Sequence, residues 1–134
     1  MDPTRLFAII SAISLPTVMF GGLSLRRLLE TSPGLTEFQR TYFRAGHAHA
    51  GVLLVLSLIY YQYLDRTTVS DGLRWVAYMI LAIGILAQSG GFFLHMVKGE
   101  PNRPSVGTLV STIGALFLAV AMLILVYALI AEWP

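Results

Sequence analysis

The stretch Val106–Ala131, VGTLVSTIGALFLAVAMLILVYALIA, contains no charged side chain. A helix needs about 20 consecutive apolar residues to cross the hydrocarbon core of a bilayer. Backbone groups in lipid must form their hydrogen bonds within the chain, so a stretch of this length is expected to be helical. The stretch therefore predicts a membrane-spanning helix.

Three further apolar stretches have a similar length. The predicted spans are about 6–25, 45–64, 73–97 and 106–131. Pro16 removes one backbone hydrogen bond from the first span, which a helix tolerates when its neighbours compensate. We expect an all-α fold, in which residues 1–134 form a single membrane domain, an integral four-helix antiparallel bundle.

The composition agrees with this fold and excludes several classes of protein. The chain is 56% hydrophobic and 12% charged, whereas soluble domains carry about 25% charged residues. A net charge of +2 without a basic block gives no reason to expect a nucleic-acid partner. The sequence has no cysteine, which excludes disulfides, iron–sulfur clusters and thiolate ligands.

Four spans place both termini on one side of the membrane and the first and third connections on the other. The longest connection is expected over Ser24–Arg44, a length that suggests function or partner contact. The positive residues are divided between the shared loop side, with Arg26, Arg27, Arg40, Arg44, Lys98 and Arg103, and the terminal side, with Arg5, Arg66 and Arg74. This bias favours cytoplasmic loops, and we expect a multi-pass protein of the bacterial inner membrane.

All three histidines fall in the leaflet nearest those loops. His47 and His49 open the second span within FRAGHAHAGVLL, Phe43–Leu54, and His95 closes the third. Residues two apart in a helix differ by about 200° around its axis. His47 and His49 are therefore expected to face different surroundings.

Small residues mark two helix faces. Gly84, Gln88, Gly91 and His95 form one stripe of the third span, and such a stripe in a membrane helix normally faces protein. A second row of small residues, on the fourth span, would allow copies of the chain to pack closely: Gly107, Ser111 and Gly114.

Three tyrosines lie near the opposite interface, at the end of the second span. Tyr60, Tyr61 and Tyr63 are interpreted as an aromatic belt. Tyrosine is enriched at membrane–water interfaces, where its ring is apolar and its hydroxyl is wet.

The histidines suggest a cofactor. Zinc takes about four ligands, and no carboxylate lies within the spans, which argues against it. Haem needs only one proximal histidine, and its propionates favour cations at the membrane edge, where Arg40, Arg44 and Arg103 lie. Structural interpretations stay open beside the haem interpretation. His47 could be an interfacial residue, His95 could cap helix carbonyls, and the arginines could only set the topology.

Two blocks resemble a known family. RAGHAHAGVLL, from Arg44, is similar to the segment of the styrene oxide isomerase family that reads Arg-Ala-His-x-Gly and contains the haem ligand. GGFFLHMVKGEPNRPSVG, from Gly90, resembles the end of that family's third helix and its Pro-Asn-Arg loop. These small four-helix proteins resemble in turn the membrane-bound hydroxylaminobenzene mutases.

The resemblance implies haem b as the cofactor. His49 matches the family's iron ligand, and Asn102 and Arg103 match its loop, whereas His47 has no counterpart. The family binds haem near the subunit contacts of a trimer, so a homo-oligomer is implied. Should the iron take a second histidine, the candidates are His95 and His47.

The reaction implied is an isomerisation. Ferric iron acts as a Lewis acid on the oxygen of a small hydrophobic epoxide, the ring opens to a benzylic cation, and a hydride shift gives an aldehyde. An apolar site protects such a cation from water. The other classes considered are a haem protein for electron transfer or gas binding, and a cofactor-free structural subunit of a membrane complex.

The chain also departs from the family. The family's tyrosine, expected at the catalytic position, falls on Phe93, which cannot donate a hydrogen bond, and an expected asparagine falls on Val55. Phe93 and His95 are about 200° apart around the helix. If Phe93 faces the haem, His95 faces away from it. If instead His95 faces the haem, the iron could have two histidine ligands, and such a site would suit electron transfer.

Overall fold

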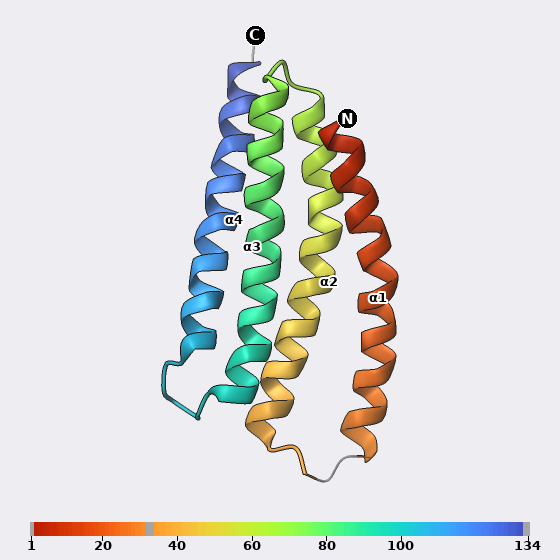
Figure 1. The fold of residues 1–134 in the computed structure, drawn as a ribbon, viewed down its shortest axis with the longest axis vertical. Coiled ribbons are helices and arrows are strands. Elements are labelled where there is room, and N and C mark those ends of the chain that lie inside the picture. The colour runs from red at the N-terminus through yellow and green to blue at the C-terminus, as the bar shows by residue number, and fades with distance from the viewer. Residues whose placement is uncertain (1, 32–33, 133–134) are drawn as a thin grey trace.

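The fold is an up-and-down bundle of four helices, seen in a computed structural model that describes residues 2–31 and 34–132. The helices are α1, Pro3–Thr31, α2, Glu37–Asp65, α3, Asp71–Lys98, and α4, Val106–Ala131. Both chain ends lie at the same end of the bundle (Figure 1). All four helices are long and apolar enough to cross a membrane, and the expected all-α class is confirmed.

The helices follow one another in a row. α2 packs between α1 and α3, and α3 packs between α2 and α4, while α1 contacts α3 and α2 contacts α4 only slightly. The α2–α3 pair therefore has one side that α1 covers and another side that α4 covers. The chemistry-bearing side chains are divided between these two sides.

Two of the helices extend past the apolar part of the sequence. α1 continues to Thr31 and α2 begins at Glu37, so the long connection expected over Ser24–Arg44 is wrong. Arg26 and Glu30 form an ion pair one helical turn apart, 3.0 Å between Nε and Oε1, which supports the polar extension of α1. Hydropathy marks where lipid ends, whereas a helix ends where its capping residues stand.

Capping side chains determine where α2 and α4 begin. Thr36 and Gln39 form a capping box, with the Gln39 N–H donated to the Thr36 hydroxyl at 3.2 Å. Ser105 and Thr108 form a second box at the start of α4. These reciprocal bonds satisfy backbone N–H groups that have no partner inside the helix.

Glycines bring α3 and α4 into backbone contact. A Cβ on Gly91 would lie 2.5 Å from the Ser111 amide nitrogen, and one on Gly107 or Gly114 would overlap the α3 backbone. The predicted stripe of small residues does face protein. The expectation that Gly107 and Gly114 serve contacts between copies is wrong, because both are buried against α3 of the same chain.

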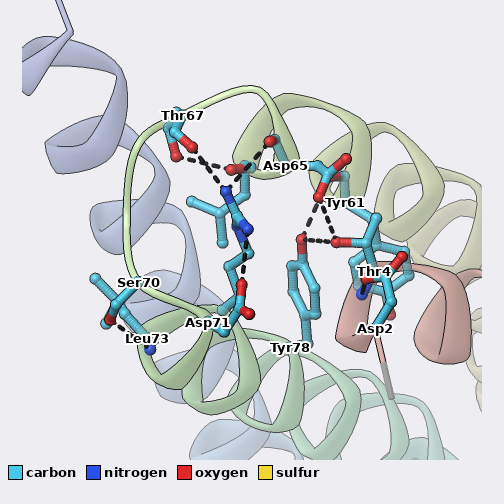
Figure 2. A network of polar contacts seen from close by, with 11 residues as sticks. Asp2, Thr4, Tyr61, Asp65, Thr67, Ser70, Asp71, Leu73 and Tyr78 are labelled. Atoms are coloured by element: carbon cyan, nitrogen blue, oxygen red, sulfur yellow. Dashed lines mark hydrogen bonds and ion pairs between the residues drawn. The ribbon is translucent and has the colours of Figure 1, made fainter.

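The terminal end of the bundle holds a tyrosine cluster. Tyr60 and Tyr61 are each 1% exposed, so they form core rather than the expected belt, and only Tyr63 is half exposed. Their hydroxyls find partners inside the protein: Tyr60 donates to the Ala121 carbonyl at 2.8 Å. Figure 2 shows the Tyr78 hydroxyl beside Thr4, at 2.9 Å. Buried hydroxyls with partners are stable in an apolar interior.

Candidate functional site

His47 faces α1. Its ring lies against two glycines, and a Cβ on Gly22 would stand 2.9 Å from the His47 Nε2. A Cβ on Gly21 would stand 3.7 Å from Nδ1. The α1 backbone thus occupies the space beside both ring nitrogens, and His47 acts as packing between α1 and α2.

His49 lies on the other side of α2, as its angle to His47 predicts. Its Nδ1 is 2.8 Å from the Ala45 carbonyl oxygen, and a carbonyl can only accept, so Nδ1 carries the proton. The ring packs on Phe92 of α3, with 4.6 Å between ring centroids. Nε2 therefore keeps its lone pair, the state in which a histidine binds a metal.

The surroundings of His49 are apolar. It borders a hollow of about 180 Å³ together with Ala48, Val52 and Leu53. Val52 is 68% exposed, so this face of α2 is open at the surface of a single chain. The hollow faces the lipid or a second protein.

His95 is held in the opposite tautomer. It is 5% exposed, and its Nδ1 lies 2.6 Å from the Ser105 hydroxyl and 3.3 Å from the Thr108 hydroxyl. The Ser105 oxygen already accepts two backbone N–H groups, those of Gly107 and Thr108. Both of its lone pairs are then in use, so its proton is the group that it offers to the histidine. Nδ1 is thus the acceptor, and Nε2 carries the ring proton.

Ring contacts connect the two histidines. The Tyr42 ring centroid lies 4.4 Å from that of His95 and 6.2 Å from that of Phe92, which in turn packs on His49. We call His95, Tyr42, Phe92 and His49 the aromatic row. It runs between α2 and α3 on the side that α4 covers.

Phe93, the position of the family's tyrosine, points elsewhere. Its ring packs on Phe43, with 5.3 Å between centroids, and a Cβ on Gly46 would be 3.1 Å from it. It borders a hollow of about 350 Å³ that α1 shares. Phe93 and His49 border different hollows, and Phe92, about 100° further around the helix, is the residue beside His49.

The arginines gather at the end of the bundle where the sequence placed them. Arg40 and Arg44 line a pocket of about 500 Å³ with Arg26 and Glu30, between α1 and α2. Arg40 donates from Nε to the Leu35 carbonyl at 3.2 Å. Because Arg40 is about 180° from His49 around α2, the structure does not bring these two residues together.

The connection between α3 and α4 carries the other two expected site residues. Arg103 pairs with Glu100 at 3.1 Å and is 77% exposed. Asn102 takes a left-handed backbone conformation, with φ 63°, which asparagine tolerates better than most residues. Both are therefore turn residues of this connection, at the same end of the bundle as the histidines.

Four residues near the histidines have a recognisable sequence pattern, although they are not among the predicted site residues. Tyr42 and His49 are two turns apart on one face of α2, and Phe92 and His95 are neighbours on one face of α3. Ser105 and Thr108 have capping-box spacing.

Comparisons of the chain with protein-family models, with curated proteins and with solved structures found no match.

Proposed function

We propose that the protein is a haem-b protein of the bacterial inner membrane, with His49 as the iron ligand. The observation that supports this best is the 2.8 Å hydrogen bond from His49 Nδ1 to the Ala45 carbonyl. Histidine ligands of metals usually donate their other N–H to such an acceptor, which fixes the ring and its tautomer. Neither His47, which is packed against α1, nor His95, with Nδ1 engaged, is prepared in this way.

The size of the hollow at His49 supports an oligomer. At about 180 Å³ it falls below the range of roughly 300–1,000 Å³ usual for ligand sites, so one chain supplies part of a haem site. A second copy seated over Val52 and its apolar neighbours would supply the rest. We propose a homo-oligomer, a trimer by resemblance to the isomerase family, embedded in membrane lipid.

Propionate contacts follow from this arrangement. Arg40 and Arg44 lie on the α1 side of their own α2, so they would reach a propionate across a subunit contact. Arg103 and Asn102 would approach from the connection after α3. Charge-assisted bonds from arginine to a carboxylate are among the strong polar contacts of proteins.

The proposed reaction is the isomerisation of a small apolar epoxide to an aldehyde, as in the family that the two sequence blocks resemble. Bound ferric haem supplies a Lewis acid for the epoxide oxygen. The residues of the chain would have three roles: His49 would hold the iron, Phe92, which packs on the His49 ring, would fix its orientation, and Val52 and Leu53 would exclude water from the site.

The absorption spectrum of the purified protein tests the cofactor. We expect a Soret band in the native protein and in the His47→Ala variant, and loss of most of the band in the His49→Ala variant. Equal loss in both variants would show that neither histidine is the specific ligand. A native protein that is colourless and stays so after haem is added would refute haem binding. The interpretation as a cofactor-free structural subunit would then be the one that remains.

A further inference from the structure

A second hollow, distinct from the one at His49, lies between α2, α3 and α4. It has a volume of about 290 Å³, and Tyr42, Phe92, His95 and Ala115 are among the residues that line it. We call it the α2–α4 pocket. Its volume is at the small end of the range for ligand sites, about 300 Å³, and no charged side chain lines it.

His95 contributes a hydrogen-bond donor to this pocket. Its Nδ1 accepts the 2.6 Å hydrogen bond from Ser105, so its proton is on Nε2. Among the residues that the structure describes, no acceptor for this proton is found. His95 as a whole is only 5% exposed, yet its Nε2 is not among the described polar atoms that are both unpaired and fully enclosed by protein. A molecule in the pocket can therefore reach this N–H group.

Tyr42 contributes a second donor from the facing helix. Its ring packs edge-on against His95, and within the described residues its hydroxyl has no hydrogen-bond partner. Two donors, one from α2 and one from α3, therefore border a single hollow. Its wall also contains Phe92, Gly91 and Ala115 and, from α4, the hydroxyl side chains of Thr108, Ser111 and Thr112. Such a pocket favours a ligand that accepts and carries no charge.

We propose that the α2–α4 pocket binds a small, neutral, mostly apolar molecule through one oxygen acceptor, such as a carbonyl, ether or epoxide oxygen. His95 Nε2 and the Tyr42 hydroxyl are the donors that position this oxygen. The assignment goes beyond the proposed function, because this pocket shares no lining residue with the hollow at His49. Binding itself requires no haem.

A pair of probes of the same shape tests the role of the oxygen. Acetophenone carries a carbonyl, and α-methylstyrene replaces its oxygen with a methylene group. With the protein in phosphatidylcholine nanodiscs, infrared difference spectra of carbonyl-¹³C acetophenone should show a band shifted below the one in protein-free nanodiscs. Tyr42→Phe keeps the ring and should weaken acetophenone binding about threefold to tenfold, the range expected for one hydrogen bond, without changing α-methylstyrene binding.

Variants of α4 test the location. Ala115→Leu fills the pocket and should remove the shifted band, whereas Ala119→Leu, one turn further on and outside the lining residues, should retain it. His49→Ala should also retain the band. A native protein without a shifted band, a band that survives in Ala115→Leu, or equal weakening of both probes by Tyr42→Phe would overturn the proposal.

The same samples separate this site from the haem proposal. Loss of the band in His49→Ala would show that the ligand sits on iron, which would refute the α2–α4 pocket and support the haem. A colourless protein that still shifts the band would refute the haem and support the pocket. A coloured protein without the shifted band would support the haem and refute the α2–α4 pocket.

Discussion

His47 and Gly22 meet so closely that a single added carbon at position 22 would stand 2.9 Å from the histidine Nε2. Contacts below 3.0 Å require one partner to move, and the facing partner here is a ring held between two helices. Gly22 is thus the residue on α1 that makes room for His47 on α2.

This contact predicts a compensating pair of variants. Gly22→Ala should destabilise the protein by about 1–3 kcal/mol, the usual range for overpacking, less a gain of up to about 1 kcal/mol in helix propensity. In a His47→Ala background the same change should become neutral or stabilising. Thermal unfolding in detergent, followed by circular dichroism, measures this coupling, and equal effects of Gly22→Ala in both backgrounds would contradict the contact.

Adjacent glycines of α3 provide a second matched test. A Cβ on Gly91 would lie 2.5 Å from backbone atoms of Ser111, whereas one on Gly90 meets no atom within 4 Å. Gly91→Ala should therefore cost at least about 1–3 kcal/mol, since backbone must move, and Gly90→Ala should be neutral or stabilising. The same unfolding experiment compares them, and the opposite order would show that α4 does not pack where the structure has it.

The aromatic row makes a prediction about chemistry. Under the proposed function, a hydroxyl placed beside His49 would supply a hydrogen-bond donor for ring opening, and removal of such a donor commonly costs about 10²-fold in rate. Phe92→Tyr should therefore raise the rate at which the haem-loaded protein converts an aryl epoxide to an arylacetaldehyde, by up to about 10²-fold. Phe93→Tyr, whose ring borders the hollow shared with α1, should leave the rate unchanged.

Gas chromatography of the aldehyde measures both variants against the native protein and against His49→Ala. A gain in Phe93→Tyr without one in Phe92→Tyr would show that the substrate occupies the α1 side. Product formed equally by the His49→Ala protein would exclude iron on His49 as the catalyst.

The end of α4 makes a prediction about pH. The Thr68 N–H donates to a carboxylate oxygen of Glu132 at 2.7 Å, and the Thr68 hydroxyl donates to the same oxygen. The side-chain bond, and then the backbone bond, lower the pKa of Glu132 from its ordinary value of 4.5. A lowered pKa means that this contact stabilises the fold above the ordinary value and is lost as the pH falls through the folded-state pKa.

Hydrogen exchange of the Thr68 amide reads this out. Protection should fall as the pH drops below about 4.5 in the native protein, after correction for the intrinsic pH dependence of exchange. Glu132→Gln should exchange faster at neutral pH and show no such fall. An unchanged profile in Glu132→Gln would mean that another acceptor holds the amide.

The sequence predicts the fold well because its signals are physical and local. Four apolar runs are read directly as spans, and the stripe from Gly84 to His95 identifies the α3 face that meets α4. The angle between His47 and His49 follows from helix geometry alone. None of these signals requires knowledge of how the helices are arranged around one another.

The candidate site depends on how the helices are arranged around one another, and this arrangement could not be predicted from the sequence. Hydropathy could not show that Tyr60 and Tyr61 turn inward, because an interfacial tyrosine and a buried one look the same in sequence. The motif match points to Phe93, whereas Phe92 is the residue that packs on His49. The two positions are adjacent on the helix, and a short motif match does not show which of them faces the histidine. Which arginine reaches which anion depends on the side of α2 that each occupies.

Ser105 couples two properties that are usually independent. Its hydroxyl caps α4 through Gly107 and also gives its proton to His95. An insertion or deletion in residues 99–104 that starts α4 one residue earlier or later would move that hydroxyl away from the ring, and His95 would then be free to carry its proton on the other nitrogen. The length of the connection between α3 and α4 thereby selects which nitrogen of His95 carries the proton.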